Sequence, residues 1–289
     1  MNGLTKFNRL VCSSPAKINR FLHICGQRSD GYHQLQTVFQ YLDWSDTLTF
    51  ELRDDATIQL HCDDATLANE DNLCVRAAFA LREYTGLTQG VHIALNKRLP
   101  TGAGLGGGSS NAATTLVALN KLWSLALSQS TLLSLAKGLG ADVPFFIYGH
   151  AAWGEGIGEQ LTYVEPNRPW VVLLIPNCHV STQKIFSHSK LTRHSKTMKM
   201  ATFVAGDDSS LFTNDCEPLV RRLYPEVDQA FIALMPFATP RLTGTGSCVF
   251  ALLSTDQEAL AIQKALSCEF QCHVAKVMNT SPLYANMSL

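Results

Sequence analysis

Hydrophobic and polar positions divide the chain into short runs of period two and longer runs of period three to four. A period of two is typical of strands, whereas apolar residues three or four positions apart form one face of a helix. The pattern predicts strands over residues 13–24, 38–42, 46–52, 91–95, 143–148, 170–175, 249–253 and 270–277. It predicts helices over residues 71–81, 111–123, 132–139, 182–186, 217–234 and 256–266.

The order of these segments indicates the fold class and the domain organisation. Strands and helices alternate without a long series of Val- and Ile-rich strands, which favours an α+β fold over a doubly wound parallel sheet. Gly, Pro and polar residues gather between Glu155 and Pro169, and a chain of 289 residues is long for one core. We therefore expect two domains, residues 1–160 and residues 161–289, and an exposed basic loop over residues 187–199.

The strongest local signal is the glycine-rich stretch PTGAGLGGGSSN at residues 100–111, between a predicted strand and a predicted helix. Glycine allows the backbone to turn tightly and to approach a ligand closely. Ser109, Ser110 and Asn111 are expected to supply the N-cap side chains of the helix. Free backbone N–H groups at a helix N-terminus bind anions, so the stretch predicts a phosphate site rather than a flexible linker.

Two common phosphate-binding motifs fit this stretch poorly. Gly102, Gly104 and Gly107 formally satisfy the dinucleotide fingerprint, but that motif also needs an acidic residue about 20 positions further on. The chain has no Asp or Glu between Tyr84 and Ala141. The Walker motif needs a lysine directly after the glycines, and none is present there. An NAD-binding oxidoreductase is therefore disfavoured.

The charge distribution adds a second indication of an anionic ligand. The net charge is −1, which gives no reason to expect nucleic acid or a membrane as a partner. The acid-free segment nevertheless contains Lys97, Arg98, Lys121 and Lys137, which favours a polyanion at short range. Asp142 is the first carboxylate after this segment, and the pattern alone leaves it as either a surface turn residue or a placed base.

Other features bear on the cellular compartment. The chain has no apolar run of the ~18 residues typical of a membrane span. Its first ten residues lack the apolar core of a signal peptide. Nine cysteines, an odd number, are expected to be free thiols in a reducing cytoplasm. We expect a cytoplasmic protein, and the sequence leaves its oligomeric state open.

Three motifs, in this order, resemble those of the GHMP kinases. They are PAKIN at residues 15–19, the glycine-rich stretch, and a second glycine turn, TGTGS, at residues 243–247. Together they span most of the chain and are far more specific than any one of them. The resemblance implies a two-domain GHMP-kinase fold in which the glycine-rich loop leads into a helix and binds ATP, with Mg²⁺ as the accompanying ion.

Five segments narrow the resemblance to one branch of this family. They lie at residues 14–19, 28–33, 96–100, 140–144 and 241–246. This branch phosphorylates the 2-hydroxyl of 4-diphosphocytidyl-2-C-methyl-D-erythritol with ATP, giving the 2-phosphate and ADP, in the non-mevalonate route to isopentenyl diphosphate. The alternatives are another small-alcohol kinase of the family, such as homoserine or mevalonate kinase, and a nucleotide-binding relative without activity.

The same resemblance implies roles for individual residues. Asp142 is expected to accept the proton of the attacking hydroxyl, with Lys17 beside it. The expected substrate-binding residues are Asn19, Tyr32, His33 and Phe186, of which Tyr32 and His33 are expected to bracket the cytosine ring. The expected ATP-binding residues are Asn72, Leu73, Lys97, Pro100, Thr101, Gly102, Ala103, Gly104, Leu105, Gly106, Gly107, Gly108, Ser109 and Ser110. No set of protein ligands for Mg²⁺ is indicated.

Overall fold

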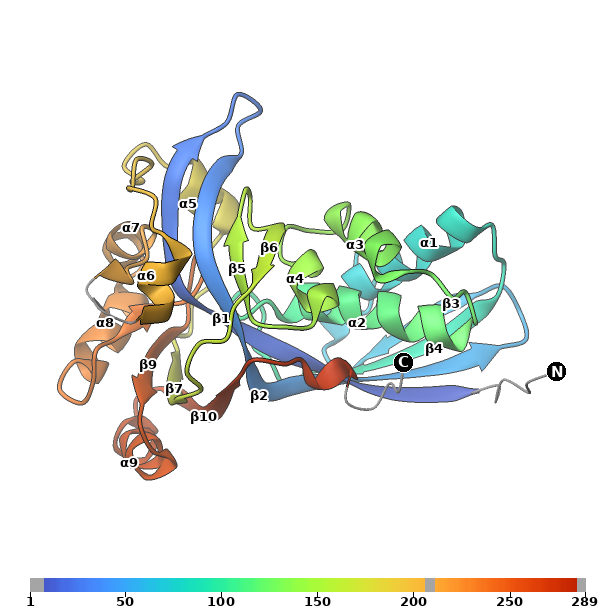
Figure 1. Ribbon diagram of the computed structural model, residues 1–289. Helices are drawn as coiled ribbons and strands as arrows, with labels where there is room; N and C mark the ends of the chain where they lie inside the picture. Colours follow the sequence, from blue (N-terminus) through green and yellow to red (C-terminus); the bar gives the residue numbers. More distant parts are fainter. Residues whose placement is uncertain (1–7, 206–210, 285–289) are drawn as a thin grey trace.

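Two long antiparallel strands extend through both halves of the molecule (Figure 1). The computed structural model describes residues 8–205 and 211–284, in which β1 spans Arg9–Gln27 and β2 spans His33–Arg53. The pattern predicts two separate strands over residues 38–42 and 46–52, and this is wrong. The polar residues between them stay in the ladder because Ser45 and Asp46 pair with β1. The first seven residues, where no signal peptide is expected, lie outside the described ones.

A ten-stranded sheet forms around this pair, along the path β3-β4-β2-β10-β7-β9-β8. The strands are β3 (Ile58–Cys62), β4 (Gly90–Asn96), β7 (Trp170–Ile175), β8 (Arg241–Leu242), β9 (Val249–Leu253) and β10 (Gln271–Met278). A hairpin of β5 (Ala152–Glu155) and β6 (Gln160–Tyr163) pairs with β2 and occupies part of the stretch in which the sequence indicates the domain boundary. β3 and β4 are parallel and the other ladders of the described strands are antiparallel, so the predicted α+β class is confirmed.

Four helices cover one side of the strands in the N-terminal half (Figure 1). They are α1 (Leu73–Thr85), α2 (Gly107–Leu122), α3 (Gln129–Lys137) and α4 (Val143–Tyr148). Asn72 caps α1, since its side chain accepts a hydrogen bond from the Cys74 N–H. The predicted serine cap of α2 is wrong: the N-cap is Gly106, in the left-handed region at φ 71°, and Ser109 and Ser110 already lie within the helix.

The segment 143–148 is a helix, α4, where the pattern predicts a strand. Pro144 lies in its first turn, where the missing N–H has no helical partner to lose. Gly149 ends the helix in the left-handed conformation. The run is buried almost throughout, and an apolar run this short has no periodicity that separates a helix from a strand.

The C-terminal half carries α5 (Thr182–Ser187), α6 (Met200–Ala205), α7 (Glu217–Leu223), α8 (Pro225–Leu234) and α9 (Asp256–Leu266). The single helix predicted over residues 217–234 is two helices. Pro225 cannot donate a helical hydrogen bond, and Tyr224 before it is extended at φ −129°. The prediction for α9 is confirmed, with a capping box between Thr255 and Glu258.

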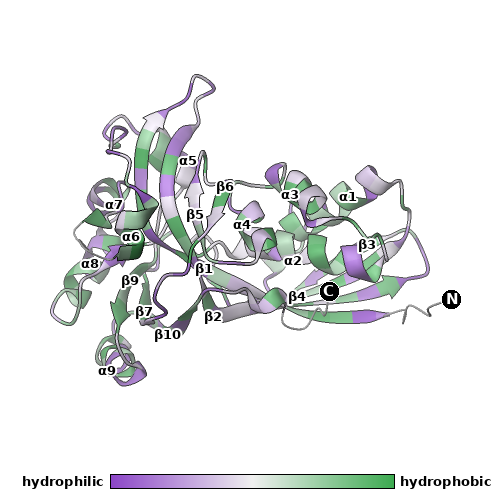
Figure 2. Ribbon diagram, in the orientation of Figure 1, coloured by the Kyte–Doolittle hydropathy of each residue, from purple (hydrophilic) through white to green (hydrophobic). Residues whose placement is uncertain are grey.

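Two large cores lie at opposite ends of the long strands. One packs α1–α4 against the strands around Tyr41 and Phe50, and the other packs α7–α9 against β7 and β9. Figure 2 shows hydrophobic residues along β9 and a mixture of hydrophobic and polar residues around α9. β1 contributes Cys12 to the first core and Leu22 to the second. All nine cysteines are free thiols, as predicted, and no described helix combines the length and hydrophobicity of a membrane span.

Candidate active site

A cleft of about 870 Å³ lies where the glycine-rich loop, the β1–β2 pair and α5 meet. It is lined by both expected catalytic residues, all four expected substrate-binding residues and all but one of the expected ATP-binding residues. The exception is Ser110, whose hydroxyl is fully buried and accepts a hydrogen bond from Ser14 at 2.8 Å. Segments far apart in the chain therefore meet in one cavity, which the sequence alone does not show.

The glycine-rich loop is pressed against the second glycine turn. Gly104 has φ 75°, and a Cβ there would collide with the carbonyl oxygen of Thr243. The Thr243 hydroxyl donates to the carbonyl oxygen of Gly104 at 3.3 Å, and the Cys248 N–H donates to that of Ala103 at 3.2 Å. Only glycine combines this backbone angle with this close approach, so the sequence of the loop is dictated by packing as well as by any ligand.

Lys17 and Asp142 meet at the centre of the cleft. The Lys17 ammonium lies 3.3 Å from the Asp142 carboxylate and donates to Oδ1 of Asn19 at 2.6 Å. The Lys17 side chain is 3% exposed, whereas that of Asp142 is 34% exposed at the start of α4. The pair therefore consists of a buried, oriented cation and a carboxylate that solvent or a ligand can reach.

β1 holds both glycine turns through neighbouring residues. The Lys17 N–H donates to the carbonyl oxygen of Leu105 at 2.9 Å, and the Asn19 N–H donates to the hydroxyl of Thr243 at 3.1 Å. The register of β1 against β2 shifts on each side of residues 17–19. Such irregularities redirect side chains next to active sites. Here the shifts lie on either side of Lys17 and Asn19, whose backbone N–H groups bond to the two glycine turns. Both residues also line the cleft.

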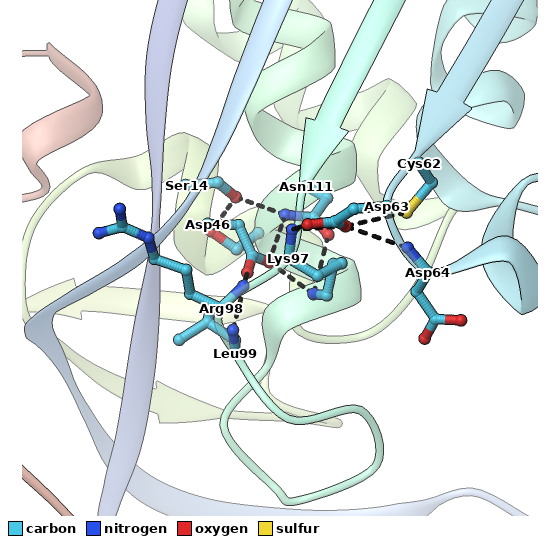
Figure 3. A network of polar contacts seen from close by, with 10 residues as sticks. Ser14, Asp46, Cys62, Asp63, Asp64, Lys97, Arg98, Leu99 and Asn111 are labelled. Atoms are coloured by element: carbon cyan, nitrogen blue, oxygen red, sulfur yellow. Dashed lines mark hydrogen bonds and ion pairs between the residues drawn. The ribbon is translucent and has the colours of Figure 1, made fainter.

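A buried polar network supports the glycine-rich loop (Figure 3). Asp46 is fully buried and accepts hydrogen bonds from the N–H groups of Arg98 (2.7 Å) and Leu99 (2.8 Å), from Asn111 Nδ2 (2.9 Å) and from the Lys97 ammonium (2.5 Å). Four donors satisfy one carboxylate, as a buried charge requires. The network ties β2 to the segment before the loop and to the first turns of α2.

At the other end of the cleft, two aromatic rings from different segments lie together. The rings of His33 in β2 and Phe186 in α5 have centroids 5.1 Å apart and are tilted by 39°. Tyr32 lines the cleft next to them and is 59% exposed. Thr182 shares a hydrogen bond with Thr245 at 2.9 Å, so α5 is attached to the second glycine turn.

The loop after α5 reaches into this aromatic end. Nε of Arg193 donates to Nε2 of His33 at 3.0 Å. Burial, followed by the positive charge of Arg193, lowers the pKa of His33 below its ordinary value. His33 is therefore neutral at physiological pH. Residues 187–199 are predicted to form an exposed loop, but within this loop Arg193 is half-buried and pairs with His33.

The comparisons with known proteins agree with this geometry. The sequence matches the family models for the GHMP kinases N terminal domain at residues 72–150 and the GHMP kinases C terminal domain at residues 200–272. A 4-diphosphocytidyl-2-C-methyl-D-erythritol kinase from Pseudomonas paraeruginosa is 49% identical over 96% of this chain and 98% of its own length. Another from Pseudomonas entomophila is 48% identical over 96% of each chain. The chain belongs to the 4-diphosphocytidyl-2-C-methyl-D-erythritol kinase family.

Solved structures of kinases share the fold. A crystal structure of 4-(cytidine 5'-diphospho)-2C-methyl-D-erythritol kinase is 30% identical, with a TM-score of 0.81, over 93% of this chain and 99% of that chain. Homoserine kinase from Cytophaga hutchinsonii is 18% identical with a TM-score of 0.70, over 97% and 98% of the two chains, and it shows the fold alone. The predicted GHMP-kinase fold is confirmed, and ATP is the phosphate donor of this kinase family.

Three residues of this kinase that the sequence does not single out complete the site. Asp46 accepts hydrogen bonds from the segment before the glycine-rich loop. The Thr243 hydroxyl accepts a hydrogen bond from the Asn19 N–H of β1, and Arg193 donates one to His33. Thr243 lies in a glycine turn that the sequence does identify, so its position could have been inferred. Asp46 and Arg193 lie in segments that look like ordinary polar surface, and neither carries a recognisable signal.

Proposed function

We propose that the chain transfers the γ-phosphoryl group of ATP to the 2-hydroxyl of 4-diphosphocytidyl-2-C-methyl-D-erythritol, with the residues of this cleft in the roles described below. The observation that carries the proposal is the Lys17–Asp142 pair at 3.3 Å, between the glycine-rich loop and the aromatic end of one cleft. A cation and an accessible carboxylate at that point are the groups that alcohol phosphorylation requires.

Asp142 acts as the general base. Its carboxylate accepts the proton of the 2-hydroxyl while the hydroxyl oxygen forms a bond to the γ-phosphorus. The bond between the γ-phosphorus and the β–γ bridging oxygen breaks, and ADP leaves with that electron pair. Lys17 stabilises the negative charge of the transferring group, because its ammonium is buried and oriented by Asn19.

The glycine-rich loop binds the triphosphate through its backbone N–H groups. These donors lie at the N-terminus of α2, a helix of 16 residues, where the helix dipole also favours anions. Asn72, Leu73 and Lys97 line the cleft near the loop and are proposed to contact the adenosine part of ATP. Ser110 is left out of the ligand contacts because it does not line the cleft.

Mg²⁺ fits this site as an ion carried by the nucleotide. Within residues 8–205 and 211–284 there is no group of three or more His, Cys, Asp or Glu side chains that could hold a metal by itself. Mg²⁺ in phosphoryl-transfer enzymes is bound mainly by substrate phosphates and one or two oxygen ligands. Ser109 lines the cleft, and its hydroxyl would supply such an oxygen; the ion would neutralise phosphate charge.

The aromatic end receives the cytosine base. Flat rings stack on bases, and Tyr32, His33 and Phe186 present three rings at the cleft wall. Asn19 lines the cleft, where its amide accepts from Lys17 at 2.6 Å and donates to Thr37 at 2.9 Å, and we propose that this fixed amide contacts the alcohol. This arrangement supports a pose in which the base lies away from the glycine-rich loop and the hydroxyl lies near Asp142.

The division of the chain and its location are also proposals. Domains 1–160 and 161–289 agree with the two matched family domains, which lie on either side of residue 160. The two largest cores also support this division, although β1 contributes to both and a third core, which contains Leu42 and Leu173, joins the two halves. Free cysteines support a cytoplasmic location.

An ADP-release assay across a panel of alcohols tests the proposed function. The protein is mixed with ATP and Mg²⁺ and with the cytidylated methylerythritol, homoserine or mevalonate. We expect ADP release with the cytidylated alcohol alone. Equal turnover of homoserine or mevalonate would overturn the substrate, and binding of NAD without affinity for ATP would overturn the reaction class.

A further inference from the structure

Arg193 joins the segments that form the aromatic end of the cleft. Its two terminal nitrogens donate to the carbonyl oxygens of Leu191 (3.2 Å), Phe186 (2.8 Å) and His188 (3.0 Å). Its Nε donates to Nε2 of His33 at 3.0 Å. One guanidinium therefore holds the end of α5, the loop that follows it and the start of β2 in a single arrangement.

The Arg193–His33 hydrogen bond determines which nitrogen of the imidazole carries the proton. A guanidinium N–H can only donate, so Nε2 of His33 is an unprotonated acceptor. In a neutral imidazole the proton then lies on Nδ1. Nδ1 has no hydrogen-bond partner among the residues that the structure describes, and His33 lines the cleft. It is therefore a donor that a ligand can use.

We propose that Arg193 is a positioning residue for base recognition, which presents His33 as an Nδ1–H donor and holds the Phe186 ring beside it. The inference rests on the proposed cytidylated substrate. N3 of cytosine accepts a hydrogen bond, whereas N3 of uracil carries a proton and cannot accept one, so a fixed Nδ1–H donor that meets N3 favours cytosine. The tautomer imposed by Arg193 thus makes the site selective for the base as well as for an aromatic ring.

The surroundings of the pair support this role. A protonated imidazole would direct an N–H on Nε2 against the N–H of Arg193, so the arrangement disfavours a second proton on the ring. His33 is 7% exposed, which allows little room for the ring to turn and exchange its nitrogens. An arginine suits the task better than a lysine, because its planar fork makes several directed hydrogen bonds at once.

Nuclear magnetic resonance of ¹⁵N-histidine-labelled protein tests the tautomer without any substrate. The His33 signals are assigned by their loss in His33→Gln. We expect Nε2 in the unprotonated range and Nδ1 in the protonated range, with both changed in Arg193→Met. Lys190→Met is the matched control, because it removes an exposed cation from the same loop. A proton on Nε2 in the wild-type protein, or an unchanged spectrum in Arg193→Met, would overturn the proposal.

Kinetics test the consequence for recognition. We expect Arg193→Met to raise KM for the cytidylated alcohol about tenfold, as for one lost hydrogen bond, while KM for ATP changes less than about twofold. The preference for CDP over UDP as a competitive inhibitor should fall by a similar factor. An equal rise in KM for ATP, or an unchanged preference for CDP, contradicts the inference.

A second variant guards against loss of folding. Arg193→Lys keeps the charge but loses the fork, so it should fold and still weaken the preference for CDP. Full retention of that preference in Arg193→Lys contradicts the role of the fork. If the wild-type protein does not phosphorylate the cytidylated alcohol at all, the proposed function fails, and the resonance measurement still decides whether Arg193 sets the tautomer.

Discussion

The two ends of the cleft are built in opposite ways. The phosphate-binding part of the ATP end is one continuous glycine-rich segment that rests on a buried polar network, and its proposed donors are main-chain N–H groups. The aromatic end is assembled from the start of β2, from α5 and from the loop after it, and its contacts are made by side chains. Substitutions in the buried network beneath the ATP end should therefore act through folding, and those at the aromatic end through substrate selectivity.

The largest effect is expected where the two ends meet. Asp142→Asn removes the proposed base while keeping the shape of the side chain, so kcat should fall on the order of 10²-fold or more. KM for either substrate should change little, because Asp142 belongs to neither recognition surface. The coupled ADP-release assay measures both constants. Asp71→Asn is the control, since Asp71 is another cleft carboxylate and should retain normal kcat. Near-normal turnover in Asp142→Asn would remove it from this role.

The next largest effect is expected beneath the ATP end. Asp46→Asn leaves the Lys97 ammonium without its charged partner and weakens three further hydrogen bonds, which should lower the free energy of unfolding by about 2 kcal/mol. Chemical denaturation measures this change. Asp63→Asn is a matched control, because Asp63 is exposed but also accepts the N–H of Lys97 at 2.9 Å (Figure 3). Equal stability of the two variants would contradict the importance of the buried network.

At the aromatic end, Tyr32→Ala should affect substrate binding alone. Loss of one stacking ring should raise KM for the cytidylated alcohol about tenfold and leave KM for ATP unchanged. Tyr32 is 59% exposed, so the fold should not depend on it. Tyr84→Ala, which removes a 58% exposed ring from α1, is the control. A rise confined to KM for ATP would mean that the two ends have been assigned in reverse.

The smallest effect is expected from pH. The folded protein binds a proton at His33 only below the ordinary pKa of 6.5, because burial and Arg193 lower it. At a pH between the lowered pKa of the folded protein and the ordinary pKa of the unfolded chain, the unfolded chain binds more protons at His33 than the folded protein does. The contribution of His33 to the free energy of unfolding therefore decreases as pH falls through this range. As the pH falls below 6.5 and His33 begins to bind a proton, the hydrogen bond from Arg193 to Nε2 is lost, so KM for the cytidylated alcohol should rise. His33→Gln should abolish the pH dependence of KM for the cytidylated alcohol. An equal pH dependence of KM for ATP would contradict the assignment of this effect to His33.

The contrast between the two ends also explains what the sequence could predict. The glycine-rich loop and α9 are local: their turn residues, caps and periodic apolar positions lie within a short stretch of chain. The sequence therefore predicts the phosphate loop, most helices and the α+β class. Two of the segments that it assigns wrongly are α4 and the helix broken at Pro225. α4 is too short for periodicity to distinguish a helix from a strand, and periodicity alone does not show that Pro225 separates α7 from α8.

Contacts between distant residues could not be predicted from the pattern. Asp46 and Lys97 are 51 positions apart, and His33 and Arg193 are 160 positions apart. Charged residues that pair only after folding leave no periodic signal and look like ordinary surface. The meeting of Lys17 with Asp142 was implied by the family resemblance, because no local pattern connects β1 with the start of α4.

The two backbone hydrogen bonds from β1 have a consequence for the dimensions of the cleft. Lys17 supports the ATP loop and Asn19 supports the second glycine turn, and two residues of a strand span about 6.6 Å. A fixed length of covalent chain therefore reinforces the direct contact between the two turns. One inserted residue at this point would alter both the spacing of these two hydrogen bonds and the direction of the side chains that follow.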